Sequence, residues 1–413
     1  MVEVQTFEMM EDFNRALKFV NKNPKKSISL FKDFIKRHGE NKEVWLNLSV
    51  AYKCIGDYEN CTTALMKAAD EKMPFSDGKF QKVYGIAMNN LGLLAHTFER
   101  EEDAEKYYYT AMEDKEHGSD NVLWNLSVSK LRRLCSDMEM DRALCWKLYD
   151  YRFKKEGATP LKNMKEGMEF WDCISNVESI CVLAEQGYGD LFMFGRYLKY
   201  LRGYAKKIWV QCDPAIKGIF ETEGYLTCLD TRETDAMHGI AMGTLPKLLP
   251  YIPSGDWLKS RYVPKVSDGG LDIGCVWEGN KYHANDRLRS TTPFFFNKLR
   301  KYGKLYSFGP GKAEKGFEYL PVKTWDDTIE QLKKLDLVIT VDTSIAHLCG
   351  SLGMPCWVMM PRMDCDFRWG LNSMGYKNVW YPSVTVIRNP NDWVKTFEHV
   401  DALLAEVTNV NDK

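Results

Sequence analysis

Residues 341–361, "VDTSIAHLCGSLGMPCWVMMP", decide the fold. The apolar run 337–341 predicts a buried strand, and the small-residue segment 345–352 predicts a helix packed tightly on it. In open parallel sheets, ligands bind beyond the carboxyl ends of the strands, where helix N-termini present unpaired N–H groups. The polar residues at this strand end are Asp342, Thr343, Ser344 and, one turn into the helix, His347. A lone histidine is more often structural than functional, but these neighbours favour a functional site that binds an anion.

The bulk composition is that of an ordinary globular protein. The 413 residues suffice for two or three domains, and 45% are hydrophobic and 27% charged. A net charge of −1 excludes a general attraction to nucleic acid or membrane. The N-terminal residues do not resemble a secretory signal, and no apolar run approaches membrane-spanning length. The twelve cysteines form no Cys-x-x-Cys pair and no zinc-like cluster, so we expect reduced thiols in a cytoplasmic protein.

Residues 1–160 predict a tetratricopeptide-like helical repeat domain. The segment 43–69 has large and small residues at tetratricopeptide spacing, a second copy lies about 34 residues earlier, and a third fits 87–114. The third copy places Leu91, Gly92, Ala95, Ala104, Tyr108 and Ala111 at the repeat positions. A fourth copy, around 123–153, is irregular. An unrelated helical bundle is the alternative, and a protein partner on the repeats is possible on architectural grounds alone.

Residues 165–413 predict two Rossmann-like α/β domains. Short apolar runs alternate with helix-length segments, a pattern typical of parallel sheets covered on both faces. The runs are 179–184, 207–212, 271–277, 304–308, 337–341, 355–360 and 384–387. A Pro- and Gly-rich break near residue 260 separates 165–262 from 266–413. The amphipathic C-terminal segment, 389–407, predicts either a surface helix of the second domain or a helix that crosses both.

Two more predicted strand ends carry polar residues. After the run 179–184, Gly187 and Gly189 allow a tight turn and close backbone approach to a ligand. Asp190 follows at the start of a predicted helix, where it is either an N-cap or a functional acid. After the run 271–277 comes a loop that is either solvated surface or a diphosphate site formed by three cations and a histidine. Its polar residues are Asn280, Lys281, His283, Asn285, Asp286, Arg287, Arg289 and Ser290.

Five segments in order resemble a known family. They are "EQGYGD", "DAMHGIAMGTLPKLLP", "VWEGNKYHANDRLRS", the opening stretch and "DFRWGLNSMGYKNVWYPSVTVIRNP". The last 245 or so residues resemble the glycosyltransferase domain that follows tetratricopeptide repeats in many bacterial and phage proteins. That domain is similar to the lipopolysaccharide heptosyltransferases and, more distantly, to the O-linked N-acetylglucosaminyltransferases. The resemblance implies a GT-B fold, in which two Rossmann-like domains enclose the active site. It also implies that the protein is located in the cytosol of a bacterium or of a phage-infected host.

The same resemblance implies the roles of individual residues. The half 165–262 would bind the acceptor and the half 266–413 a nucleotide-sugar donor, without a metal or other cofactor. Asp190 would be the general base, with Gly187, Gly189, Asn280 and His283 as further contacts to donor or acceptor. The donor's sugar and diphosphate would be bound by Arg287, Arg289, Ser290, Asp342, Thr343, Ser344 and His347. Tyr188 and Leu191 depart from the residues common in relatives, which puts the nature of the acceptor in doubt.

The leading hypothesis is therefore an inverting, metal-independent glycosyltransferase acting on a hydroxyl of a glycan, protein or nucleobase. One alternative is an inactive scaffold or adaptor in which the repeats bind a partner. The other is a phage enzyme that glycosylates a DNA base, for which a local basic stripe could bind phosphates. That stripe would comprise Lys162, Lys165, Arg196, Lys199, Arg202, Lys206 and Lys207.

Overall fold

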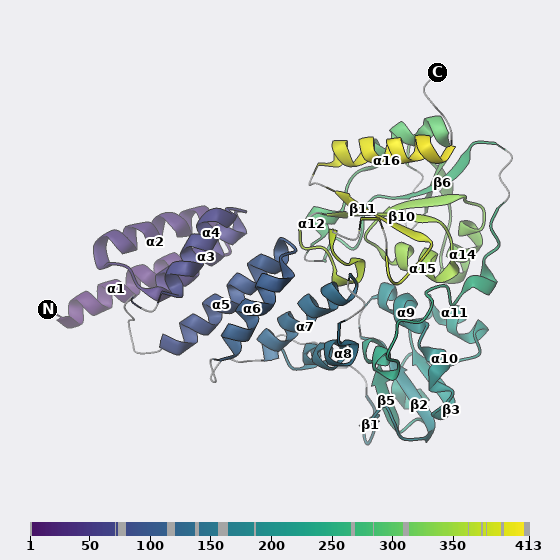
Figure 1. Cartoon of the computed structure of the whole chain (residues 1–413), viewed down its shortest axis with the longest axis horizontal. Coiled ribbons are helices and arrows are strands. Elements are labelled where there is room, and N and C mark those ends of the chain that lie inside the picture. Colours follow the sequence, from purple (N-terminus) through teal and green to yellow (C-terminus); the bar gives the residue numbers. More distant parts are fainter. Residues whose placement is uncertain are drawn as a thin grey trace. The chain divides into compact units, whose positions relative to one another are not determined.

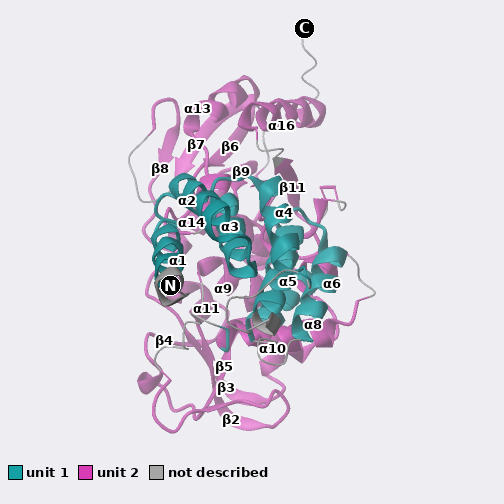
Figure 2. Ribbon diagram, turned by 90° about the vertical axis from the view of Figure 1, so that its left-hand side faces the viewer, with its two compact units in different colours: residues 1–130, 154–157 teal, residues 131–153, 158–413 magenta. Residues whose placement is uncertain are grey.

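The computed structural model of the chain is shown in Figure 1. It describes residues 2–70, 72, 80–113, 120–136, 140–155, 164–185, 187–265, 269–283, 285–308, 314–361, 363–372, 375–376, 378–389 and 392–408. The chain forms two compact units (Figure 2). Unit 1 comprises 1–130 and 154–157, and unit 2 comprises 131–153 and 158–413. Residues 131–153 thus belong to unit 2, although the helical segment predicted from sequence runs to 160.

Unit 1 is helical, as predicted. Its helices are α1 (Val2–Leu17), α2 (Pro24–His38), α3 (Lys42–Cys54), α4 (Tyr58–Ala68), α5 (Phe80–Thr97), α6 (Glu101–Met112) and the first part of α7 (Asp120–Leu134). Side chains cap three of them at their N-termini, where Asn23, Asn41 and Asp57 accept backbone N–H groups. Small residues allow close pairing: a Cβ at Gly92 of α5 would lie 2.4 Å from the Tyr108 ring of α6.

Unit 2 begins with the rest of α7, α8 (Arg142–Tyr149) and η1 (Asp150–Phe153), followed by a five-stranded parallel sheet. The sheet order is β1-β5-β2-β3-β4, and it forms what we call the first lobe. Its strands are β1 (Glu169–Phe170), β2 (Val177–Leu183), β3 (Ala205–Gln211), β4 (Leu226–Cys228) and β5 (His238–Ala241). Its helices are α9 (Tyr188–Gly195), α10 (Leu198–Leu201), α11 (Lys217–Thr222), η2 (Thr231–Glu233) and η3 (Met242–Leu248).

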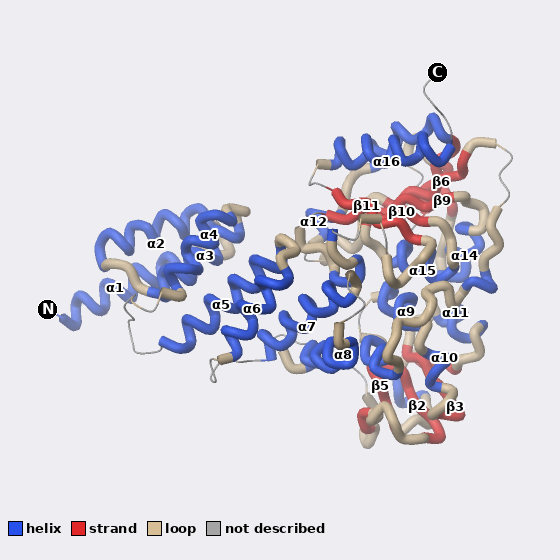
Figure 3. Tube along the Cα trace, viewed as in Figure 1, coloured by secondary structure: helices blue, strands red, loops and turns tan. Residues whose placement is uncertain are grey.

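The second lobe is built on a six-stranded parallel sheet with the order β11-β10-β9-β6-β7-β8. Its strands are β6 (Leu271–Val276), β7 (Gly303–Phe308), β8 (Glu318–Leu320), β9 (Leu337–Val341), β10 (Cys356–Pro361) and β11 (Val384–Asn389). Its helices are η4 (Lys259–Arg261), α12 (Asp286–Arg289), α13 (Pro293–Phe296), η5 (Asn297–Tyr302), α14 (Trp325–Leu332), α15 (Ser344–Leu352), η6 (Phe367–Trp369) and α16 (Trp393–Thr408). Figure 3 shows this alternation of strands and helices along the chain.

The fold class predicted from the sequence, helical repeats followed by two Rossmann-like domains, is confirmed. All five residues of β9 are buried, and β6 and β10 flank it in parallel, so this strand, predicted at 337–341, is central in its sheet. The C-terminal helix α16 lies on the second sheet, where Phe397, Val400 and Leu404 join its core. It is therefore a helix of the second lobe.

Candidate active site

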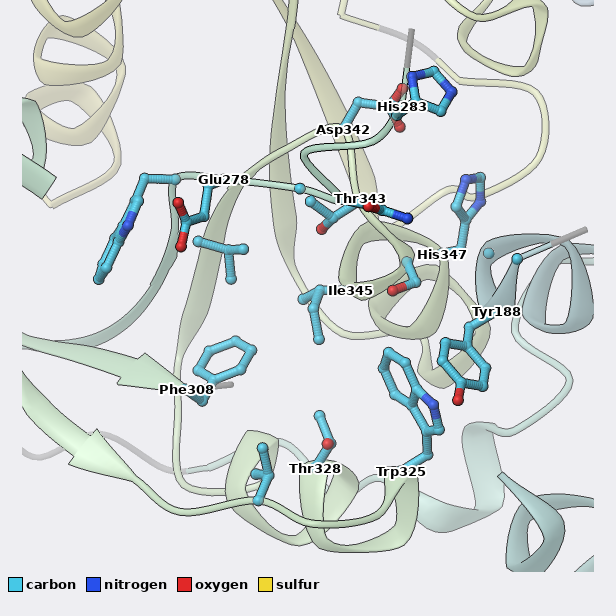
Figure 4. Close-up of a pocket in the computed structure, with 18 of the residues that line it drawn as sticks. Tyr188, Glu278, His283, Phe308, Trp325, Thr328, Asp342, Thr343, Ile345 and His347 are labelled. Atoms are coloured by element: carbon cyan, nitrogen blue, oxygen red, sulfur yellow. The ribbon is translucent and has the colours of Figure 1, made fainter. Parts of the chain in front are cut away.

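A cavity of about 1090 Å³ lies between the two lobes of unit 2. The first lobe contributes the loop and helix start after β2, and the second lobe contributes the carboxyl ends of β6, β7 and β9. Of the predicted site residues, the cavity wall contains Gly187, Gly189, Asp190, Asn280, His283, Arg289, Asp342, Thr343, Ser344 and His347. Figure 4 shows part of this wall, with Thr343, Ile345 and His347 on the start of α15. The carboxyl ends of the strands thus converge on one cavity, as expected for open parallel sheets.

Asp190 lies in the first turn of α9, with 13% of its side chain exposed. Its Oδ1 accepts a hydrogen bond from Nη2 of Arg368, which comes from the second lobe. Burial raises the pKa of Asp190 above its ordinary value, although the Arg368 guanidinium acts in the opposite direction. A buried carboxylate that faces a cavity and has a raised proton affinity is suited to accept a proton from a bound ligand.

The His347 side chain packs against α9, the helix that carries Asp190. A Cβ added at Gly189 would lie 2.9 Å from Cδ2 of His347, so the glycine allows α9 and α15 to approach this closely. The ring is 4.9 Å from that of Trp369, centroid to centroid, and its Nδ1 is 3.0 Å from the Tyr381 hydroxyl. Burial, followed by the nearby Arg368 charge, lowers the pKa of His347 to about 3. The imidazole is therefore neutral and acts by packing and hydrogen bonding.

The N-terminus of α15 opens into the cavity. Thr343 is its N-cap, but the Thr343 hydroxyl pairs with that of Thr340 at 3.0 Å and does not cap the helix. The first N–H groups of a helix have no carbonyl partner within it, so those at Ser344 and Ile345 are available to an anion. Asp342 accepts a hydrogen bond from Nε1 of Trp369 at 2.9 Å, and burial raises the pKa of Asp342 to about 6. Its side chain therefore supports this strand end through Trp369.

The polar loop after β6 enters the cavity only in part. Arg289 is buried, and its Nη1 donates to the carbonyl of Asp342 at 2.9 Å, which ties the loop to the end of β9. Ser290 accepts from the Gly279 N–H at 3.1 Å and is not among the lining residues. Arg287 is exposed and is also not among them. The structure therefore does not bring Arg287 and Ser290 to the cavity with the other predicted phosphate ligands.

Arg368 and Asp366 are lining residues that the sequence analysis did not single out. Both come from "DFRWG", at the start of the last segment that resembles the family. Nη1 of Arg368 donates to both Asp366 oxygens at 2.9 Å, and the Asp366 carboxylate also caps η6 by accepting the Arg368 N–H. Burial acts to raise the pKa of Asp366, but the charge and the hydrogen bonds of Arg368 together outweigh burial, so the pKa of Asp366 is lowered. No local sequence pattern marks this pair, because its contact with Asp190 spans 178 residues.

The opposite part of the cavity is less polar. Phe308 at the end of β7, Thr328 on α14 and Ile345 face it, and Trp325 and Tyr188 form its edge (Figure 4). The last two rings are 5.0 Å apart in an edge-to-face arrangement, and the Tyr188 hydroxyl donates to Asp213. This side has room for a flat or apolar group, and the other side presents the N-terminus of α15.

The predicted basic stripe for nucleic-acid binding is contradicted at Arg196, which is not on the surface. Arg196 is 1% exposed and donates to the carbonyls of Pro253 and Trp380. Lys206 and Lys207 lie on β3 and pair with Glu178 and Asp235. Lys162 lies outside the described residues. The observed side chains therefore do not form a continuous unpaired basic surface.

Two further properties concern the described residues only. Among them, no cluster of three or more histidine, cysteine, aspartate or glutamate side chains is arranged to hold a metal ion. None of the helices within the described ranges combines the length and apolarity needed to cross a membrane.

Comparisons with known proteins give distant similarities. No family model and no curated protein matches the chain. Among solved structures, a variant of the O-GlcNAc transferase of Thermobaculum terrenum matches 97% of this chain and 94% of its own, with 12% identity and a TM-score of 0.31. The family 9 glycosyl transferase of Veillonella parvula matches 56% of this chain and 98% of its own, with 11% identity and a TM-score of 0.38. The iron-containing dodecameric glycosyltransferase TibC of enterotoxigenic E. coli matches 54% of this chain and 66% of its own, with 11% identity and a TM-score of 0.36. The families that the motifs resemble are thus among these structures, but TM-scores below 0.5 establish neither an activity nor a ligand for this chain.

Proposed function

We propose that unit 2 is an inverting, metal-independent glycosyltransferase that moves a sugar from a nucleoside diphosphate to an acceptor hydroxyl. The observation that carries the proposal is that one cavity is lined by both a buried acid, Asp190, and the open N-terminus of α15. These groups come from different lobes, so a substrate bound between them would contact a base on one side and an anion site on the other.

The chemistry requires one proton acceptor and one site for a departing anion. The acceptor oxygen attacks the anomeric carbon, and its proton passes to the Asp190 carboxylate. The bond from that carbon to the β-phosphate oxygen breaks, and its electron pair leaves with the nucleoside diphosphate. A single displacement of this kind inverts the anomeric carbon, and it needs no second carboxylate as nucleophile.

The second lobe offers two kinds of anion ligand in place of a metal ion. The N–H groups at Ser344 and Ile345 would bind phosphate oxygens with help from the helix dipole. Arg368 and the cavity-lining Lys323 supply positive charge, and a guanidinium can bind two phosphate oxygens at once. The less polar side, with Phe308 and Ile345, would receive the nucleoside.

The test combines binding with turnover. Purified protein is screened by thermal shift against nucleoside diphosphates and their sugars, because a ligand of the native state raises the melting temperature. Release of nucleoside diphosphate from the best donor is then measured for the wild type and for Asp190→Asn. Loss of a general base should slow release by roughly 10²- to 10⁴-fold. Asp33→Asn, in an exposed pair on α2 of unit 1, is the matched control and should leave the rate unchanged.

The possible results separate the competing functions. Binding of a nucleoside diphosphate with turnover that depends on Asp190 supports the transferase. Binding without any turnover by the wild type, across donors and acceptor classes, would favour the inactive scaffold. If no nucleotide binds, the proposal for this cavity fails altogether.

A further inference from the structure

Arg368 holds two carboxylates that differ in how firmly they are fixed to it. Asp366 is two residues away, caps the same turn and bonds Nη1 through both oxygens at 2.9 Å. Asp190 reaches Nη2 through one oxygen and comes from the other lobe. Arg368 is 8% exposed, and its guanidinium carbon lies 4.5 Å from the centre of the Phe367 ring. Asp366 is thus the permanent partner of Arg368, and Asp190 is the partner that can be exchanged.

The charges at this corner disfavour a bound diphosphate unless the pairing changes. Asp190 and Asp366 together carry one more negative charge than Arg368 neutralises when both are ionised. A diphosphate at the N-terminus of α15 would bring further negative charge into the same cavity. Arg368 lines that cavity, so a phosphate oxygen and Asp190 would compete for the same N–H donors.

We infer that donor binding transfers Arg368 from Asp190 to the diphosphate, so that Asp190 becomes an effective proton acceptor only when the donor is present. This inference rests on the proposed function and adds a coupling between its two substrates. The physical reason is that a buried carboxylate that loses its counter-ion holds a proton more strongly. The groups that act on Asp190 agree with this: burial raises its pKa, Arg368 lowers it, and the charges of Asp366 and Glu185 raise it. Removing the Arg368 contribution leaves only causes that raise the pKa.

The coupling would activate the base only in an enzyme that already holds its donor. Before the donor binds, the Asp190 carboxylate is paired with Arg368 and is a weaker base than after the pairing is lost. After the donor binds, the same carboxylate is unpaired and directly faces the acceptor side.

The experiment is a double-mutant cycle on nucleoside diphosphate binding, measured by calorimetry without any turnover. The probe is whichever of UDP, ADP, GDP, CDP and dTDP gives the largest thermal shift with the wild type. The four proteins are the wild type, Asp190→Asn, Arg368→Gln and the double variant. Arg368→Gln should weaken binding about tenfold or more, and Asp190→Asn should tighten it about tenfold because the competitor for Arg368 is gone.

The decisive result is how Asp190→Asn acts when Arg368 is absent. Exchange predicts that the tightening largely disappears in the Arg368→Gln background. Simple repulsion between Asp190 and the diphosphate predicts equal or greater tightening there, and that result would overturn the inference. If Arg368→Gln does not fold, Arg368→Met takes its place in the cycle, and unchanged or weaker binding by Asp190→Asn alone still contradicts the exchange. The absence of binding to the wild type would instead refute the proposed function itself.

Discussion

Gly189→Ala tests the contact that brings the candidate base next to the second lobe. The added methyl would lie 2.9 Å from Cδ2 of His347, whereas ordinary contacts are 3.4–4 Å. The His347 ring cannot simply turn away, because it packs on Trp369 and its Nδ1 is bonded to Tyr381. We therefore expect α9 to shift away from α15 by about 0.5 Å or more.

The magnitude follows from two opposing effects. Inserting a methyl into a filled contact costs about 1–3 kcal/mol, and alanine in a helix is about 1 kcal/mol better than glycine. The net loss of stability should be about 1 kcal/mol, equivalent to about 2–4 °C in melting temperature for a unit of this size. Because Asp190 is the next residue, the shift should also slow turnover about tenfold, since a 1 Å misplacement can cost about 10²-fold.

The assay is thermal unfolding of the variant beside Gly187→Ala as the control for stability. A Cβ at Gly187 meets nothing within 4 Å, and its φ of −80° suits alanine. This control should melt within about 1 °C of the wild type. In a His347→Ala background, Gly189→Ala should stabilise instead of destabilise, because the clash is gone. If Gly189→Ala still destabilises equally in that background, the contact with His347 is not the cause.

Two further predictions concern buried acids of unit 2. Glu185→Gln should lower the stability of unit 2 by about 3–5 kcal/mol, because Glu185 accepts hydrogen bonds from Arg152 at 2.6 and 2.9 Å and both side chains are less than 10% exposed. The control is Glu178→Gln, which removes an exposed ion pair with Lys206 and should change the melting temperature little. Burial raises the pKa of Asp342 to about 6, so its contribution to stability is full below about pH 4 and is lost as the pH rises through 6. The free energy of unfolding of the wild type minus that of Asp342→Asn should therefore fall by roughly 3 kcal/mol between pH 4 and pH 7 in denaturant titrations, and a pH-independent difference would contradict the assignment.

The strands that the sequence predicted are the long, apolar ones. All seven predicted runs are strands, because buried parallel strands must be apolar on both faces and are readable without tertiary information. The four that were missed, β1, β4, β5 and β8, have two to four residues each. Of these, β5 is an interior strand, but "HGIA" is short and includes a glycine whose Cβ would lie 3.1 Å from Leu183. Its place in the sheet depends on that packing and not on a local pattern.

The site residues that could be predicted from the sequence are those that follow the ends of long strands. Asp190, Thr343, Ser344 and His347 follow β2 and β9 directly, and parallel strands bring their carboxyl ends to one edge. The charged loop was less predictable, because the side chains of residues two apart on a helix turn to different sides. Of the two arginines in α12, Arg289 is buried and Arg287 is exposed to solvent.

The way the lobes are joined bears on how such a site could be regulated. The N–H of Trp325 at the start of α14 donates to the Ala215 carbonyl at 2.9 Å, and buried Arg196 donates to the Trp380 carbonyl at 2.7 Å. Each bond links the first lobe to the second, and breaking the bond between Arg196 and Trp380, both 1% exposed, would leave a buried carbonyl without its partner. Opening the cavity by a hinge is therefore costly, whereas turning Arg368 from Asp190 to a bound anion keeps the guanidinium paired. If the two substrates communicate, this argues that they do so through the exchange of a counter-ion and not through lobe closure, and the binding cycle on Asp190 and Arg368 would register that difference directly.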